Sequence, residues 1–126
     1  MIKLELLGDP ISNNALYKAT NRGKFTSVYM TKDGKRLKES YSKQALKQYS
    51  GNILSYELYI EIDLYFGNKR RHDYDNYGKI LNDSLTGIIW EDDSQIRHCG
   101  KIKKHYDKNN PRIEILIEKY KDKNTC

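Results

Sequence analysis

The expected fold is decided by one stretch, Tyr56-Glu57-Leu58-Tyr59-Ile60-Glu61-Ile62-Asp63-Leu64-Tyr65-Phe66. Leucine, isoleucine and phenylalanine alternate there with glutamate, aspartate and tyrosine. Side chains of a strand point alternately to the two faces of a sheet, so this period of two predicts a long β-strand with one buried face. One face of the sheet should therefore be covered by the rest of the chain.

Other segments supply partners for this strand. Residues 1–7 and 112–118 also alternate between apolar and polar side chains, which predicts two further strands. Apolar residues at four-residue spacing predict a helix over 36–50, and a second amphipathic pattern predicts a helix over 74–86. Two more strands are expected, a short one at 25–30, closed by a turn at Asp33-Gly34, and a longer one at 94–105. The segments without an apolar period are a polar loop at 9–24, a basic turn at 67–72 and a disordered charged tail from 119. This order predicts a single α+β domain over residues 1–126, with a mixed or antiparallel sheet packed against two helices.

Composition limits the class of protein. The chain has 126 residues, of which 37% are hydrophobic and 32% charged, with a net charge of +6. Such a basic balance favours a polyanionic partner, first nucleic acid and second an anionic membrane. No apolar run is long enough to span a membrane, the N-terminus lacks the apolar core of a signal peptide, and the two cysteines form no disulfide framework. A cytoplasmic location is therefore expected.

The residues richest in chemistry lie just after the central strand. Asp73 and Asp75 directly follow a basic run, and a lysine comes one helical turn later; the residues are Lys69, Arg70, Arg71, Asp73, Asp75 and Lys79. A second acidic pair follows at Asp92-Asp93. Carboxylate oxygens are preferred ligands of Mg²⁺, and lysine and arginine attract phosphate. The alternative is that these aspartates serve as a helix cap, surface ion pairs and a turn.

Two other metal sites are excluded by spacing. A calcium loop beginning at Asp73 would need an oxygen ligand at Tyr77 and a glutamate at Ser84. The histidines and cysteines lack the paired spacing of a zinc site.

Basic residues recur elsewhere. Arg97, Lys101 and Lys103 alternate along one predicted strand, and Lys18, Arg22 and Lys24 lie in the polar loop. Clustered positive charge binds backbone phosphates, although a solvated surface remains an alternative reading. Tyr17, Tyr29 and Tyr74 are candidates for stacking on bases, or else for the core.

Taken together, four segments resemble the RusA family of Holliday junction resolvases. They are Asp73-Tyr74-Asp75-Asn76-Tyr77-Gly78-Lys79, then Asp83-Ser84-Leu85-Thr86-Gly87, then Trp90-Glu91-Asp92-Asp93-Ser94-Gln95-Ile96, and the earlier Pro10-Ile11-Ser12-Asn13-Asn14. The likeness covers residues 4 to 118, and its specificity comes from the combination of segments.

This resemblance implies a homodimeric endodeoxyribonuclease of DNA recombination and repair. It would depend on Mg²⁺, with Mn²⁺ as a possible substitute, and would cut four-way junction DNA by paired nicks. By the same likeness Asp73, Asp75 and Asp93 are the expected metal ligands and Lys79 the expected catalytic lysine, with Asp92 as a secondary ligand. The segment between Leu85 and Trp90 is one residue shorter than in some relatives, which leaves the choice between Asp92 and Asp93 open.

The remaining assignments concern DNA contact. The residues expected to position the DNA backbone are Lys69, Arg70, Arg71, Arg97, Lys101 and Lys103, while Asn13 and Asn14 are expected to contact DNA or the dimer partner. Three other functions stay open at this point. They are a DNA-binding protein without catalysis, a metal-dependent nuclease that prefers flaps or duplex DNA, and a basic RNA-associated protein.

Overall fold

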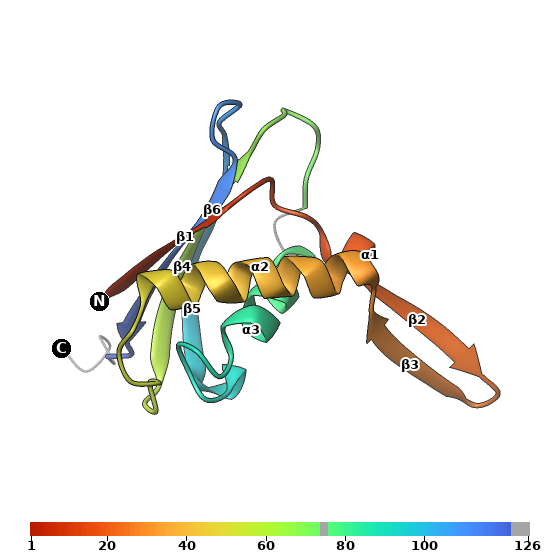
Figure 1. Cartoon of the computed structure of the whole chain (residues 1–126), viewed down its shortest axis with the longest axis horizontal. Coiled ribbons are helices and arrows are strands. Elements are labelled where there is room, and N and C mark those ends of the chain that lie inside the picture. Colours follow the sequence, from red (N-terminus) through yellow and green to blue (C-terminus); the bar gives the residue numbers. More distant parts are fainter. Residues whose placement is uncertain (74–75, 122–126) are drawn as a thin grey trace.

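A mixed four-stranded sheet forms the centre of the molecule. The computed structural model describes residues 1–73 and 76–121. The strand order is β1 (Ile2–Leu7), β6 (Arg112–Lys119), β4 (Leu58–Phe66) and β5 (Ile96–Tyr106). β6 runs antiparallel to both β1 and β4, whereas β5 runs parallel to β4 (Figure 1). The predicted α+β fold with a mixed sheet is confirmed.

Two helices cover one face of this sheet. The predicted alternation in β4 is exact, since its five apolar residues are buried and the four polar or tyrosine residues between them are not. The buried face packs against α2 (Lys32–Gln48) and α3 (Gly78–Leu85), and the single core includes Tyr41, Ile80 and Trp90. At about 25 cal/mol per Å² of buried apolar surface, this burial is the main source of stability. No helix in the described parts of the chain is long and apolar enough to cross a membrane.

The helix α2 starts four residues earlier than the sequence pattern predicts. Thr31 is its N-cap, and the Thr31 hydroxyl accepts a hydrogen bond from the N–H of Gly34 at 3.1 Å. Gly34, which we interpreted as part of a turn, lies inside the first turn of the helix. A Cβ atom there would come within 2.6 Å of the carbonyl oxygen of Leu16 and of Met30 Cγ. Gly34 is therefore required by close packing, and the predicted turn is wrong.

The polar loop expected at 9–24 is also wrong. It contains a short helix, α1 (Asn13–Leu16), followed by β2 (Tyr17–Arg22). β2 pairs with β3 (Phe25–Met30) in an antiparallel hairpin closed by Gly23, whose φ of 62° fits a two-residue hairpin turn. Most of this hairpin is exposed on both faces, so it carries no apolar period from which it could have been predicted.

Three other boundaries differ from expectation. The strand predicted at 94–105 runs from 96 to 106, because a single 3₁₀ turn, η2 (Asp93–Gln95), precedes it. The helix predicted at 74–86 begins at Gly78. Tyr77, the residue before it, is buried in the core and packs edge-on against the ring of Phe66 at a centroid distance of 5.5 Å. β6 reaches Lys119, and the Tyr120 N–H donates to the Glu57 carbonyl at 2.8 Å, so order extends past the expected start of the tail.

The strand β5 is bulged, which changes its faces. Register shifts place Cys99 opposite Ile60 and Lys101 opposite Glu61. Ile60 and Glu61 are neighbours that point to opposite faces of β4, so Cys99 and Lys101 also lie on opposite faces although they are two residues apart. The prediction that Gln95, Arg97, Cys99, Lys101, Lys103 and His105 share one face is therefore wrong for Cys99, whereas Lys101, Lys103 and His105 do share a face, opposite Glu61, Asp63 and Tyr65.

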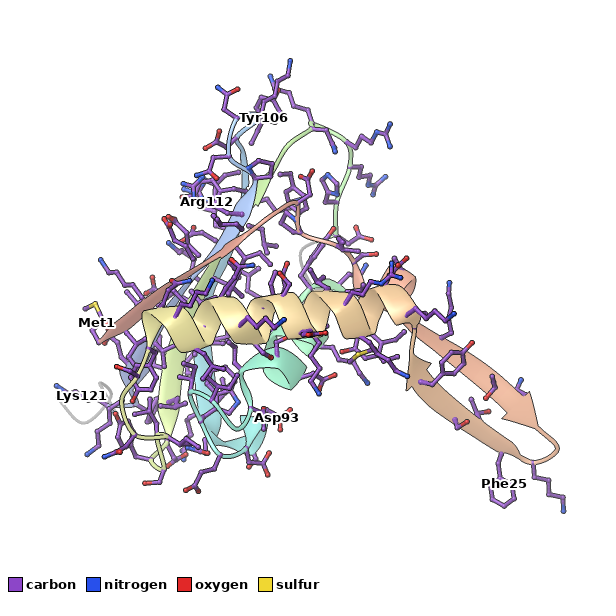
Figure 2. All side chains as sticks on the ribbon, viewed as in Figure 1. Met1, Phe25, Asp93, Tyr106, Arg112 and Lys121 are labelled. Carbon is purple, nitrogen blue, oxygen red and sulfur yellow. The ribbon has the colours of Figure 1, made fainter. Side chains whose placement is uncertain are left out.

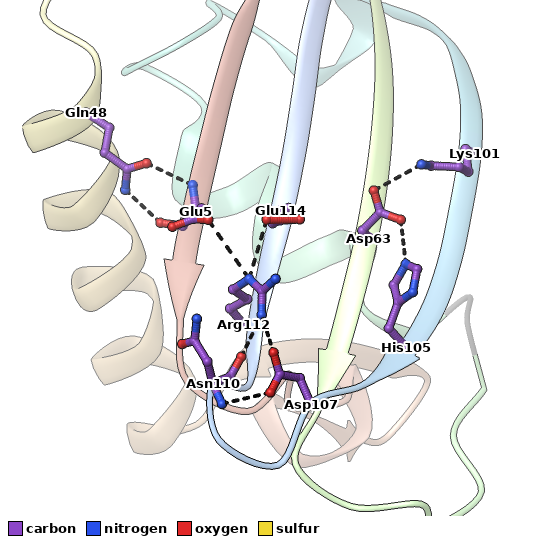
Figure 3. A network of polar contacts seen from close by, with 9 residues as sticks. All are labelled: Glu5, Gln48, Asp63, Lys101, His105, Asp107, Asn110, Arg112 and Glu114. Atoms are coloured by element: carbon purple, nitrogen blue, oxygen red, sulfur yellow. Dashed lines mark hydrogen bonds and ion pairs between the residues drawn. The ribbon is translucent and has the colours of Figure 1, made fainter.

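The outer edge of β1 is bonded to α2 side chains. Gln48 accepts a hydrogen bond from the Glu5 N–H at 2.8 Å and donates one to the Glu5 carbonyl at 2.6 Å, while Gln44 accepts from the Leu7 N–H at 2.7 Å (Figure 3 shows the Gln48 pair). The N–H and carbonyl of Glu5 and the N–H of Leu7, which β1 presents at this edge, are thereby satisfied by side chains.

Candidate active site

The polar side of α3 carries the first part of the site. Ile80, Leu81, Ser84 and Leu85 of this helix are buried, which leaves Lys79 exposed and Asp83 half-buried on the other side. Residues four apart on a helix lie next to each other. The lysine and the carboxylate therefore project from neighbouring turns at one surface.

Tyr17, the first residue of β2, joins this surface from a distant part of the sequence. Its hydroxyl donates a hydrogen bond to Asp83 Oδ2. The Nζ atom of Lys79 lies over the Tyr17 ring, 4.7 Å from the ring centroid, which is within the range of a cation–π contact. Burial, the hydrogen bond to Asp83 and the charge of Asp83 all raise the pKa of Tyr17, so its hydroxyl stays a neutral donor around pH 7.

The loop after Trp90 carries the second part of the site. Trp90 is buried, and its Nε1 donates to Thr86 Oγ1 at 3.0 Å, which anchors the start of the loop. Asp92 caps the turn η2: its Oδ1 accepts from the Ser94 N–H at 3.1 Å, and its own N–H donates to Gln95 Oε1 at 2.8 Å. This reciprocal capping box fixes the backbone of the loop.

The adjacent carboxyls of this loop differ in acidity. The hydrogen bond from the Ser94 N–H lowers the pKa of Asp92. A hydrogen bond to Asp92, loss of solvent and the negative charges of Asp92 and Asp83 raise the pKa of Asp93. Asp93 thus lies in the field of two other carboxylates, from its own loop and from α3. Such crowding of like charges is relieved by a proton or a bound cation.

Asp73 follows an anchored segment. The ring of His72 stacks on Phe66 at 3.8 Å between centroids, and the Tyr77 hydroxyl lies 3.4 Å from His72 Nδ1. Lys104 Nζ donates to the His72 carbonyl at 2.6 Å, so the peptide directly before Asp73 is held to β5. The side chain of Asp73 itself is exposed.

The predicted ligands are only partly placed by the structure. Asp75 lies outside the described residues. Within residues 1–73 and 76–121 no three histidine, cysteine, aspartate or glutamate side chains come together as a metal site. The donor types fit a hard divalent ion, because carboxylate oxygens are its preferred ligands and the negative charges of Asp92 and Asp83 both act on Asp93. Asp73, Asp75 and Asp93 as a ligand set therefore stay a prediction.

The contact between Tyr17 and Asp83 was not predicted from the sequence. Asp83 was named only within the family segment Asp83-Ser84-Leu85-Thr86-Gly87, although its place four residues after Lys79 was a usable signal. Tyr17 and Asp83 are 66 residues apart in the sequence, and no local sequence pattern predicts a contact between them.

The basic residues differ in what they contact. In the segment before Asp73, Arg71 is exposed, the Arg70 N–H donates to Asn68 Oδ1 at 3.0 Å, and Lys69 Nζ lies 5.0 Å from the centroid of the Tyr106 ring. This segment lines a hollow of about 280 Å³ together with His72 and β5. Its lining includes His72, the residue directly before Asp73 in the chain.

On the open face of the sheet, positive charge is largely neutralised. Lys101 pairs with Asp63 at 3.1 Å, and Arg97 pairs with Glu57 at 3.1 Å, while Lys103 is exposed. Arg112 lies among three carboxylates, those of Glu5, Asp107 and Glu114 (Figure 3). Carboxylates therefore offset much of the positive charge that the sequence places along β5.

The two asparagines of α1 lie beside the hairpin. Lys18 Nζ donates to the Asn14 carbonyl at 3.3 Å. Asn13 Oδ1 is buried and has no hydrogen-bond partner within the described part of the protein. Neither contact tests whether these residues bind DNA or a second subunit.

The fold and the site together define a class: a small α+β domain with clustered carboxylates suited to a divalent ion and a basic segment directly before Asp73 in the chain. Within that class the family is clear, because the sequence model of Endodeoxyribonuclease RusA matches residues 8–118 of the 126-residue chain. The chain belongs to the RusA family of Holliday junction resolvases and is an endodeoxyribonuclease. Comparison with curated proteins gives no match.

Proposed function

We propose that this protein resolves four-way DNA junctions by metal-dependent hydrolysis of the phosphodiester backbone, acting as a homodimer. The single observation that carries this proposal is the family match over residues 8–118, which includes every acidic residue of the site. A two-fold dimer presents two equivalent sites, which suits paired nicks in the two equivalent strands of a junction.

The acidic residues would hold the ion. Asp73, Asp75 and Asp93 are the proposed ligands, with Asp92 as a secondary one because its Oδ1 is already engaged by the Ser94 N–H. A bound Mg²⁺ or Mn²⁺ supplies a more acidic water and charge stabilisation at the scissile phosphate. The raised pKa of Asp93 supports its role as a metal ligand, because a carboxylate close to other negative charges is stabilised most by a nearby cation.

The basic residues would bind the substrate. Lys79 is exposed beside the carboxylates and carries a mobile ammonium that can offset charge growing on the phosphate. The hollow formed by Lys69, Arg70 and Arg71 lies next to Asp73 and suits a backbone phosphate. Lys103 would add positive charge from β5. Arg97 and Lys101 form ion pairs with carboxylates, which they would have to release in order to bind a phosphate.

A cleavage assay with a matched control tests the proposal. Four-way, flapped and linear DNA would be incubated with the wild type and with the variant Asp93→Asn, in Mg²⁺ and separately in Mn²⁺. We expect paired nicks in the four-way DNA by the wild type, and at least a hundredfold slower nicking by Asp93→Asn with junction binding retained in EDTA. Glu91→Gln, an exposed neighbour in the same loop, should behave as the wild type.

Each other result has a clear meaning. Equal nicking by Asp93→Asn would remove the proposed metal site. Preference for flaps or duplex would keep the nuclease but reject junction resolution, and binding without any nick would indicate a DNA-binding role. Light scattering after size exclusion would reveal whether the protein is a dimer in solution. Since its substrate is DNA, we expect the protein to act in the cytoplasm.

A further inference from the structure

The β2–β3 hairpin projects away from the body of the molecule (Figure 1). Its strands are bonded to each other over six residue pairs and by two side-chain hydrogen bonds, Thr20 to Ser27 at 3.0 Å and Thr26 to Asn21 at 2.6 Å. An isolated two-stranded ribbon is marginally stable in water, and these cross-strand contacts offset its lack of a core. The hairpin is therefore ordered without being packed.

Large apolar side chains lie on this ribbon without cover. Phe25, at the far end of the hairpin (Figure 2), is 79% exposed, and Val28 and Tyr29 are 59% and 49% exposed. Such residues contribute nothing to the core, and exposed apolar surface is a liability for solubility. An exposed phenylalanine at the tip of an ordered projection therefore points to a partner that covers it.

The chemistry of the hairpin selects that partner. Its strand register places Lys18 opposite Tyr29 and Thr20 opposite Ser27, so a lysine, two hydroxyls and an aromatic ring share one face. Lys24 lies in the turn, and no aspartate or glutamate occurs between Pro10 and Lys32. Lysines, hydroxyls and tyrosines contact DNA phosphates, two-stranded ribbons fit the major groove, and phenylalanine can insert between base steps.

The root of the hairpin is part of the catalytic surface. Tyr17 begins β2, bonds Asp83 and lies under the ammonium of Lys79. At about 3.4 Å per residue, the five steps from Tyr17 to Arg22 place the tip about 17 Å from this root. DNA rises 3.4 Å per nucleotide along one strand, so the same span is about five base pairs.

From these observations we propose that the β2–β3 hairpin is a DNA-binding arm. It grips a duplex arm of the substrate about five base pairs from the scissile phosphate, and Phe25 makes an apolar contact with the bases there. This inference rests on the proposed function for its substrate, DNA. A second copy of the chain is the competing occupant, and the lack of acidic residues on the hairpin favours a polyanion over a protein that carries the same net positive charge.

Binding measured without cleavage tests the arm separately from the chemistry. The intact protein would be titrated against a fluorescent four-way junction in EDTA. We expect Phe25→Ala to weaken binding at least fivefold, because contact between an aromatic ring and a base is lost. Phe25→Trp should restore affinity, and Leu46→Ala, which truncates a side chain 58% exposed on α2, should leave affinity unchanged.

The position of the contact can be read from the DNA. Single 2-aminopurine substitutions along each arm should show a fluorescence change confined to about five base pairs from the cut, and Phe25→Ala should abolish it. Lys24→Gln should reduce the slope of log K against log salt by about 0.9, as expected for one lost phosphate contact.

The outcomes separate the two proposals. Unchanged junction affinity of Phe25→Ala would overturn the arm and leave the nuclease intact. A wild type that binds through Phe25 but never nicks DNA would reject the proposed function and retain the arm. A change of the native mass of Phe25→Ala in light scattering would instead assign the hairpin to contact between copies. Because Phe25 is largely exposed, thermal unfolding of the variant should match that of the wild type.

Discussion

Removing one oxygen atom, by Tyr17→Phe, should weaken the attachment of the β2–β3 hairpin to α3. The ring beneath Lys79 remains, while Asp83 loses the only side-chain donor that the structure gives it within the described residues. A hydrogen bond to a charged group contributes about 1.5–3 kcal/mol, and the half-buried setting favours the lower end of that range. We expect a loss of about 1.5 kcal/mol in the free energy of unfolding, or about 3–8 °C in Tm.

A double-mutant cycle isolates this bond. Urea unfolding of the wild type, Tyr17→Phe, Asp83→Ala and the double variant should give a coupling free energy of about 1–2 kcal/mol. The bond also has a pH signature. Because folding raises the pKa of Tyr17, its contribution is complete below the unfolded pKa of about 10 and is lost as pH rises toward the higher folded pKa. Wild-type stability should therefore fall more steeply above pH 10 than that of Tyr17→Phe, and a coupling near zero would refute the reasoning.

Three further predictions concern the scaffold. Gly34→Ala should lower stability by about 1–3 kcal/mol in urea unfolding, since its Cβ would fall 2.6 Å from the Leu16 carbonyl oxygen; unchanged stability would mean that the neighbouring backbone yields freely. Thr31→Ala should cost about 1 kcal/mol through loss of the α2 cap, measured as a lower urea midpoint, and Thr31→Ser should recover most of it. For Asp63, burial raises the pKa, but hydrogen bonds from His105 and from a lysine outweigh burial and lower it. The Asp63 contribution is therefore present above the unfolded pKa of about 3.9 and is lost as pH falls through the lower folded pKa, so Asp63→Asn should flatten the acid limb of a stability profile.

The sheet was predictable because its strands bury one face. Period-two alternation is imposed on β1, β4 and β6 by a shared core, and each of these strands was located to within two residues at either end. The hairpin escaped prediction for the opposite reason, since a ribbon exposed on both faces is under no such constraint. The bulges of β5 likewise depend on its pairing with β4 and leave no trace in the local pattern.

Sequence patterns point to candidate site residues only where these residues are close together in the chain, as in the Asp92-Asp93 loop. The capping box of this loop explains why two adjacent carboxylates are tolerated there. Tyr17 and Asp83 meet only because α1 turns the chain so that β2 starts beside α3. Contacts of this kind depend on the three-dimensional path of the chain, which amino-acid spacing does not encode.

The hydrogen bonds between Gln44 and Gln48 of α2 and the backbone of β1 have a consequence for self-assembly. Gln44 and Gln48 occupy three of the backbone groups that an incoming strand would need, those of Glu5 and the N–H of Leu7, so growth by strand addition at the β1 margin is hindered. The opposite margin, β5, is discouraged from such growth by its bulges and its lysines. Replacing both glutamines with alanine should therefore make the protein prone to fibrous aggregation through the β1 margin.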